Sequence, residues 1–116
     1  PTDRSPHPRN YGTFARLLGH YARDEAVLPI HTAIHKVTQL PAERINIDDR
    51  GRLAVGAIAD IAALDLGAVI DRSTFSEPHQ YAEGAHHVFV GGTAVLLEGE
   101  MTGERPGRVI RSSQYR

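Results

Sequence analysis

The chain has 116 residues, of which 41% are hydrophobic, and its formal net charge is −1. A chain of this length is expected to fold as one domain that buries roughly 60–70% of its extended surface, so full disorder is not expected. The near-neutral charge argues against nucleic acid or an anionic membrane as a partner, and no apolar run approaches membrane-helix length. Because cysteine is absent, a disulfide scaffold and a thiolate metal site are excluded, and a reducing, cytoplasmic location is expected.

The first half of the chain has helical patterning. PTDRSPHP (1–8) contains three prolines and predicts an irregular loop. From Thr13, a plausible N-cap, apolar side chains at helical spacing predict an amphipathic helix. A second helix is expected to begin near Pro29 and to be ended or kinked by Pro41, with PAER (41–44) adding a short turn. The apolar positions of the first helix are Phe14, Leu17, Leu18, Tyr21 and Ala22.

The second half is patterned as short strands. The run from Ile58 to Leu66 predicts a strand covered on both faces, and 71–85 predicts a long polar loop. Two β-favouring runs flank Gly91-Gly92, which predicts a two-residue hairpin turn. The fold class is therefore α/β, with helices first and strands after. Because these strands would leave open edges and the chain begins at Pro1 without Met, we expect a fragment of a longer protein.

Several groups of reactive side chains suggest metal-binding or catalytic sites, but each lacks a residue that such a site would need. His31 and His35 share one helix face, but the intervening TAI supplies no Glu for a zinc-protease motif and no third ligand is indicated. His86 and His87 are adjacent in a strand and should point to opposite faces. The sequence also has no G-x-S-x-G elbow and no phosphate-binding glycine loop. We therefore expect no metal ligands and no catalytic residue in this segment.

One stretch, HPRNYGTF (7–14), has a clearer chemical meaning. Pro6 and Pro8 should hold His7 extended, because a residue before proline avoids the α region. Arg9 then offers a planar guanidinium suited to bidentate binding of a carboxylate. The alternative is an arginine that donates only to loop carbonyls, and the residues by themselves leave both interpretations open.

Three stretches together resemble a known family. They are HPRNYGTFARLLGHYAR, LPIHTAIHKVTQLPAERINIDDRGRLAVGAIADIAALD and STFSEPHQYAEGAHHVFVGGTAVLLEGEMTGERPGRVIR. In this order, and especially in PHQYAEG and TGERPGR, the chain resembles the C-terminal portion of the N-acyl-D-amino-acid deacylases, the D-aminoacylase branch of the metal-dependent amidohydrolases. His31 and Thr32 stand where acidic residues are common in that family.

The resemblance implies a TIM-type barrel that carries zinc, together with a small β-sandwich domain built from both ends of the chain. Residues 1–46 would then be the last-strand loop and two outer helices of the barrel, and 47–116 the C-terminal part of the β-domain. It also implies hydrolysis of an N-acyl-D-amino acid to a carboxylate and a free D-amino acid. The zinc ligands and an aspartate general base would lie upstream of this segment, and Asp3 is a poor substitute for that base. The segment alone is therefore expected to be inactive.

The resemblance also assigns substrate-binding residues and partners. Arg9 matches the arginine expected to bind the substrate's α-carboxylate, with His7 and Tyr11, and less specifically Asn10, beside it. The expected partners are the N-acyl-D-amino acid and the remainder of the deacylase chain. Two alternatives stay open: a non-catalytic β-rich interaction module that self-associates through open strand edges, and part of a related amidohydrolase that acts on cyclic amides. Side-chain specificity is expected to depend on residues outside this segment.

Overall fold

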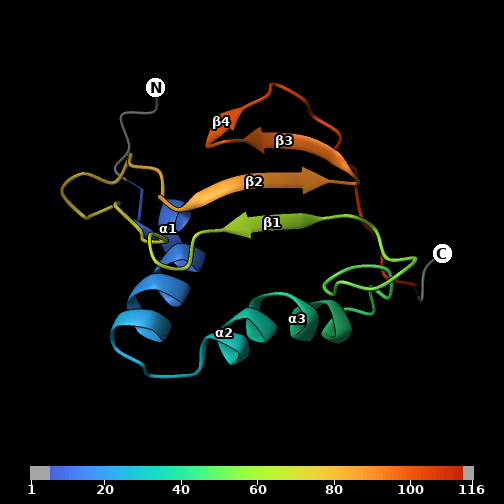
Figure 1. Ribbon diagram of the computed structural model, residues 1–116, viewed down its shortest axis with the longest axis horizontal. Helices are drawn as coiled ribbons and strands as arrows, with labels where there is room; N and C mark the ends of the chain where they lie inside the picture. The colour runs from blue at the N-terminus through green and yellow to red at the C-terminus, as the bar shows by residue number, and fades with distance from the viewer. Residues whose placement is uncertain (1–5, 114–116) are drawn as a thin grey trace. The chain divides into compact units, whose positions relative to one another are not determined.

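The computed structural model describes residues 6–113, and these form helices followed by a sheet (Figure 1). The sheet has the strand order β1-β2-β3-β4, and the β2–β3 and β3–β4 pairs are antiparallel. The expected α/β class is therefore confirmed. None of the described helices is long and apolar enough to cross a membrane. The elements are α1 (Arg9–Arg16), η1 (Leu17–Asp24), α2 (Ile30–Val37), α3 (Gln39–Arg44), β1 (Ile61–Leu64), β2 (Ala85–Val90), β3 (Thr93–Leu97) and β4 (Glu100–Met101).

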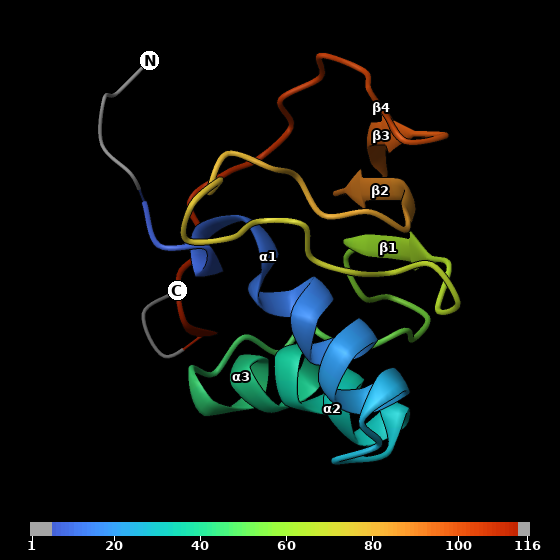
Figure 2. The same cartoon turned by 90° about the vertical axis from the view of Figure 1, so that its left-hand side faces the viewer.

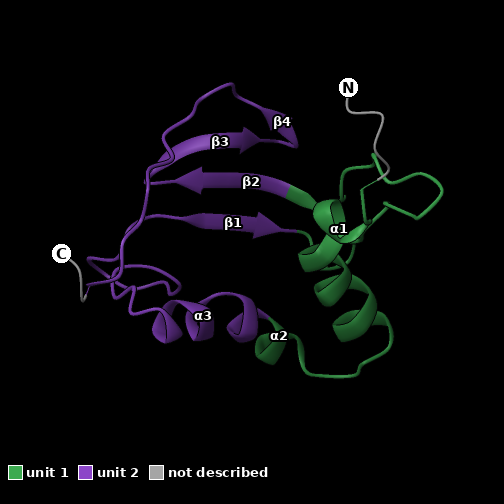
Figure 3. Cartoon of the chain, turned by 180° about the vertical axis from the view of Figure 1, so that it is seen from behind, with its two compact units in different colours: residues 1–33, 65–85 green, residues 34–64, 86–116 purple. Residues whose placement is uncertain are grey.

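The chain divides into two compact units, each made of two stretches of sequence (Figure 3). The first unit comprises 1–33 and 65–85, and the second comprises 34–64 and 86–116. Every buried apolar side chain of the described residues belongs to the first unit. The second unit therefore has no fully buried apolar side chain of its own among the residues that the structure describes. These buried residues are Leu18, Ala22, Ala33, Val69 and Pro78.

The first helix begins earlier than the sequence predicts. Pro8 occupies the N-cap position with φ −50°, and α1 starts at Arg9. Proline suits this place because its φ is already near the helical value and it has no N–H to leave unpaired. The prediction that Thr13 caps the helix is wrong, because its hydroxyl donates instead to the Arg9 carbonyl at 2.6 Å. Arg9 and Tyr11 consequently lie on the first turns of a helix rather than in a loop.

The helix continues without a break from α1 into η1 (Figure 2). The η1 segment is wound as a π-helix. At its end the Glu25 N–H donates to the His20 carbonyl, five residues back, at 2.9 Å. Leu18 and Ala22 are buried as the apolar spacing predicts, whereas Phe14 remains 65% exposed. The sequence did not predict the wider π turns. Over only two turns of helix, the spacing of apolar residues does not distinguish a π-helix from an α-helix.

The second predicted helix is present, in two pieces. α2 begins directly after Pro29, and α3 contains the whole PAER stretch. The interruption falls at Thr38, with φ −124° and ψ −87°, three residues before Pro41. A proline disturbs the turn that precedes it, so this break agrees with the expected effect of Pro41.

The predicted hairpin is confirmed. Gly91 and Gly92 have φ of 56° and 83°, and they join β2 to β3 with Val90 opposite Thr93. A second tight turn at Glu98 and Gly99, both also at positive φ, adds the two-residue strand β4, which the sequence did not predict. Positive φ at both central positions is what a tight turn between twisted antiparallel strands requires.

The strand predicted over Ile58–Leu66 is shorter and more exposed than expected. β1 covers only Ile61–Leu64, and its first three residues are exposed rather than covered on both faces. It lies at one edge of the sheet, where its outer side has no strand partner among the described residues. The side-chain carboxylates of Asp60 and Asp65, which flank it, accept hydrogen bonds from the turn N–H groups of Gly91 and Gly67.

Candidate functional site

The structure places the three predicted site residues at the start of α1, in the first unit. His7 lies just before the helix, and its ring atom Nδ1 accepts a hydrogen bond of 3.1 Å from the Arg9 backbone N–H. This bond satisfies one of the four N–H groups that the first turn of a helix leaves unpaired. Arg9 is exposed, and no described residue forms a hydrogen bond or ion pair with its guanidinium.

A loop from a distant part of the sequence packs against this helix start. The Tyr11 hydroxyl and His79 Nδ1 form a hydrogen bond of 2.9 Å, and the two rings meet edge to face at 5.7 Å. Tyr81 also contacts the Tyr11 ring, with centroids 5.8 Å apart, and Phe75 meets the His7 ring edge to face at 5.0 Å. Both rings that flank Arg9, at positions 7 and 11, are therefore held by the same loop.

This loop, Asp71–Glu83, is closed by its own hydrogen bonds. At its base, Ile70 and Glu83 pair as an isolated antiparallel bridge, and Arg72 donates to Glu83 at 2.6 Å. The Arg72 guanidinium lowers the pKa of the Glu83 carboxyl by hydrogen bonding to the carboxylate. Within the loop, the buried Ser73 hydroxyl donates to the carbonyl of Pro78 at 2.6 Å. His79 therefore follows directly after an anchored residue.

Two further contacts attach the base of the loop to α1. Arg16 forms an ion pair of 3.1 Å with Asp71. The pKa of Arg16 is raised, first by its hydrogen bond with Tyr21 and next by that with Asp71, so the guanidinium stays charged. Gly12 faces Asp71 so closely that a Cβ on Gly12 would lie 2.5 Å from the Asp71 Cβ. A glycine is required here because the helix backbone and the loop touch directly.

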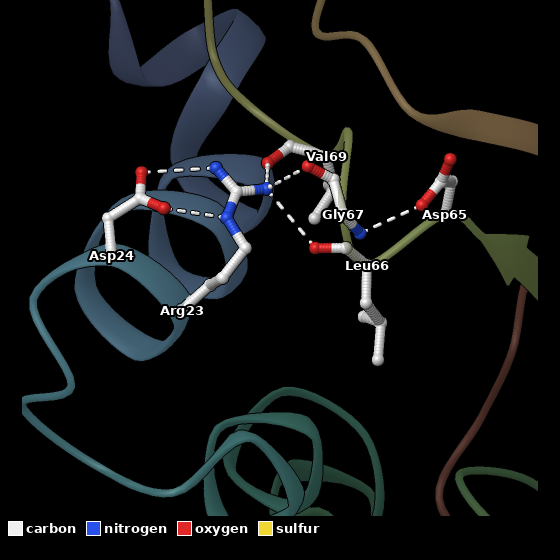
Figure 4. Close-up of polar contacts among 6 residues, drawn as sticks. All are labelled: Arg23, Asp24, Asp65, Leu66, Gly67 and Val69. Carbon is white, nitrogen blue, oxygen red and sulfur yellow. Dashed lines mark hydrogen bonds and ion pairs between the residues drawn. The ribbon is translucent and has the colours of Figure 1, made fainter.

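An arginine near the end of η1 holds the turn that precedes the loop (Figure 4). Nη1 of Arg23 donates to three backbone carbonyls, those of Leu66, Gly67 and Val69, at 3.1, 3.0 and 2.9 Å. Its other face forms a bidentate pair with Asp24, which lowers the pKa of that carboxyl. The sequence analysis did not assign any role to Arg23.

The histidines do not form a metal centre in the part of the chain that the structure describes. No group of three or more His, Cys, Asp or Glu side chains able to hold a metal ion occurs among residues 6–113. His31 and His35 are both exposed on α2. In β2, His86 is exposed and the half-buried His87 accepts a hydrogen bond from the Glu98 N–H at 3.1 Å. Asp3 lies outside the described residues.

The second unit has a hollow of its own, of about 480 Å³, which none of the predicted site residues lines. Arg50 lies in its wall and donates to Asp60 at 2.7 Å, and Asp60 in turn accepts from the Gly91 N–H at 2.7 Å. Arg50 and Asp60 are thus engaged in holding the hairpin turn.

The sequence analysis missed three residues of the first-unit site: Phe75, His79 and Tyr81. The signal that could have found His79 and Tyr81 is PHQYAEG, the stretch on which part of the family resemblance rested. The stretch PHQYAEG does not reveal that these residues contact Tyr11, because His79 and Tyr11 are 68 residues apart in the sequence.

Comparison with known families defines the class of protein. The amidohydrolase family model matches residues 1–96, and the chain therefore belongs to the amidohydrolase family. The D-aminoacylase of Alcaligenes xylosoxydans xylosoxydans is 46% identical over 110 residues, which are 95% of this chain and 23% of that protein. N-acyl-D-glutamate deacylase and N-acyl-D-aspartate deacylase of the same organism are each 44% identical over 111 residues, covering 96% and 95% of this chain and 22% of each relative.

Solved structures agree with these relatives. A crystal structure of D-aminoacylase superimposes with a TM-score of 0.90 at 42% identity, over 96% of this chain and 23% of that one. The N-acyl-D-glutamate deacylase from Bordetella bronchiseptica, in complex with zinc and a phosphonate inhibitor that mimics the tetrahedral intermediate, gives a TM-score of 0.87 at 37% identity, over 93% and 23%. The chain thus spans less than a quarter of the length of the relatives it matches.

Proposed function

We propose that the chain is a segment of a zinc-dependent deacylase that hydrolyses the amide bond of N-acyl-D-amino acids to a carboxylate and a free D-amino acid. The observation that carries this proposal is the 46% identity with D-aminoacylase over 95% of the chain. Relatives named for D-glutamate and D-aspartate match almost equally, at 44%. The segment therefore carries sequence features common to deacylases of different specificity. The preference for one D-amino-acid side chain would depend on residues elsewhere in the enzyme.

In this proposal Arg9 binds the feature common to all such substrates, the α-carboxylate. Its guanidinium is exposed and has no partner among the described residues, and its planar fork matches two carboxylate oxygens. The start of a helix also carries partial positive charge, which favours an anion there. His7 and Tyr11 are two residues before and two residues after Arg9, and in this proposal they line the same substrate position.

The described residues do not fit a zinc ion, since no suitable group of three or more ligands is present among them. Zinc, and the general base, would have to be supplied by other residues of the complete enzyme, so we derive no metal-dependent step from this chain. The chain alone is accordingly expected to be inactive. A cytoplasmic location remains part of the proposal, supported by the lack of cysteine.

We further propose that 1–46 belong to the end of a TIM-type barrel and 47–116 to a small β-sandwich domain. Superposition on deacylase structures at TM-scores of 0.87 and 0.90 supports this assignment. The second unit has no fully buried apolar side chain among its described residues. The remainder of the deacylase chain is the partner that would cover its apolar surface.

The test is to replace the matching segment of Alcaligenes xylosoxydans xylosoxydans D-aminoacylase by this chain, giving what we call the assembled enzyme. We expect it to bind zinc and to release D-amino acids from N-acetyl-D-amino acids. The matched control is the same replacement with the corresponding segment of N-acyl-D-glutamate deacylase, a relative of equal similarity. If the control is active while the assembled enzyme is inactive, or hydrolyses only cyclic amides, the proposal is wrong.

A second candidate function, self-association of a non-catalytic module, is favoured by one observation. β1 lies at the edge of the sheet, and Ile61, Ala62 and Ala63 are exposed there. Such an edge can pair with the same edge of a second copy. Sedimentation of the chain alone distinguishes the two: a dimer that Ala62→Pro converts to a monomer supports the module, and a monomer at all concentrations contradicts it.

A further inference from the structure

We propose that His79 is a positioning residue for Arg9, acting through Tyr11, and that it thereby sets how tightly the substrate carboxylate is bound. This inference rests on the proposed function, in which Arg9 binds that carboxylate. His79 itself would touch neither the substrate nor the metal. Its role would be to fix the first turns of α1 against the loop Asp71–Glu83.

The argument begins with the position of Arg9 between two attached neighbours. His7, two residues before it, contacts Phe75 ring to ring at 5.0 Å. Tyr11, two residues after it, bonds to His79 at 2.9 Å. These two contacts hold the backbone at the first turn of α1, from which the Arg9 side chain extends.

The backbone of Arg9 is itself fully engaged. Its N–H donates to His7 Nδ1 at 3.1 Å, and its carbonyl accepts from the Thr13 hydroxyl at 2.6 Å. Movement of the first turn would therefore break hydrogen bonds on both sides of Arg9. The guanidinium is left as the part of this residue without a partner among the described residues.

The loop that carries His79 has internal hydrogen bonds that hold its shape, in addition to its contacts with α1. Ser73 bonds to the Pro78 carbonyl at 2.6 Å, and the Thr74 hydroxyl accepts from the Glu77 N–H at 2.9 Å. Ser73 and Pro78 are both buried, and His79 follows immediately. The imidazole therefore projects from a fixed backbone, and either its Nδ1–H or the Tyr11 hydroxyl acts as the donor.

The discriminating experiment compares two substrates on variants of the assembled enzyme. One is an N-acetyl-D-amino acid, and the other is the same compound with a carboxamide in place of the carboxylate. For His79→Ala and for Tyr11→Phe, we expect KM for the carboxylate substrate to rise about tenfold with kcat unchanged, and KM for the carboxamide to stay the same. His79→Asn keeps a polar atom near the position of Nδ1 and should restore most of the lost affinity.

The control variant lies outside this loop. Arg52→Ala changes an exposed arginine of the second unit and should leave both KM values unchanged. The double variant Tyr11→Phe with His79→Ala should be no worse than either single variant, because both remove the same bond.

Two results would overturn the inference, and they are distinguishable. Equal losses for the carboxylate and carboxamide substrates would show that His79 does not act through carboxylate binding, while the proposed function stands. If the assembled enzyme has no deacylase activity before any substitution while the control replacement is active, the proposed function is wrong. The positioning role of His79 is then wrong as well.

Discussion

The carbonyl oxygen of Val69 accepts a hydrogen bond of 2.9 Å from Nη1 of Arg23, which lies 46 residues earlier in the sequence. Val69 is 3% exposed, and two glycines approach its backbone. A Cβ on Gly19 would lie 2.0 Å from the Val69 oxygen, and one on Gly84 would lie 2.5 Å from the Val69 Cα. The helix end and the turn are thus in direct backbone contact, with no room for a side chain between them.

This contact predicts a large effect of Gly19→Ala. In an exposed helix the substitution would be favourable, but here the new methyl group would displace the Val69 carbonyl and disturb its bond to Arg23. We expect the free energy of unfolding to fall by about 1–3 kcal/mol, as for an overpacked site. Urea unfolding followed by circular dichroism measures it. Gly107→Ala is the control, since nothing lies within 4 Å of its Cβ position, and an equal loss in that variant would contradict the explanation.

The proposed role of Arg9 predicts a selective loss of substrate affinity. In the assembled enzyme, Arg9→Ala should raise KM for N-acetyl-D-amino acids roughly tenfold to hundredfold, the range expected when a charge-assisted hydrogen bond is removed. Arg9→Lys should lose less, because it keeps the charge but not the bidentate fork. Steady-state kinetics are the measurement, with Arg52→Ala at another exposed position as the control. An unchanged KM for Arg9→Ala would exclude carboxylate binding by this residue.

The Arg72–Glu83 pair predicts a defined pH dependence. Its hydrogen bond of 2.6 Å lowers the pKa of Glu83 in the folded chain. A carboxyl group with a lowered pKa stabilises the fold above its unfolded pKa, about 4.3, and this contribution is lost as the pH falls through the folded value. Arg72→Gln should raise the pKa of Glu83 toward that of an unpaired carboxyl, whereas Arg72→Lys should raise it less. Titration of the Glu83 carboxyl carbon by NMR tests this, and identical curves for the two variants would exclude a charge effect.

In the second unit, Asp60 connects two separate elements. It accepts from Arg50 at 2.7 Å and from the Gly91 N–H of the hairpin turn, also at 2.7 Å. The Arg50 side chain is only 11% exposed, so Asp60→Ala would remove its ion-pair partner at 2.7 Å and leave the Asp49 carboxylate at 3.9 Å. We expect a loss of about 1–3 kcal/mol in unfolding free energy. Asp48→Ala, at an exposed position, is the control and should change it little.

Local features of the fold were predictable from the sequence, and long-range ones were not. The hairpin at Gly91-Gly92 was found because the turn itself demands positive φ at two adjacent residues. The start of the first helix was misplaced because Pro8, not Thr13, supplies the N-cap position. The exposure of β1 was misjudged because an apolar run does not reveal whether a strand is central or at an edge.

The candidate site shows the same division. His7, Arg9 and Tyr11 were singled out from the sequence and the family resemblance, and the structure places them together at the start of α1. His7 contacts Phe75, and Tyr11 bonds to His79. These contacts join two distant segments of the sequence, and no hydrophobic periodicity in the sequence relates one segment to the other. Which loop supports a given turn is a property of the folded chain, and one sequence without spatial information does not determine it.

Stretches of the two compact units alternate along the chain, and this affects how the gene segment can be exchanged by recombination. The first unit uses 1–33 and 65–85, and the second uses 34–64 and 86–116, so neither is a continuous piece of polypeptide. A genetic crossover at any one of the three junctions separates the two stretches of at least one unit. Exchange of either unit alone between related genes would need a crossover at each of the three junctions, so the four stretches are expected to be transmitted together as one block.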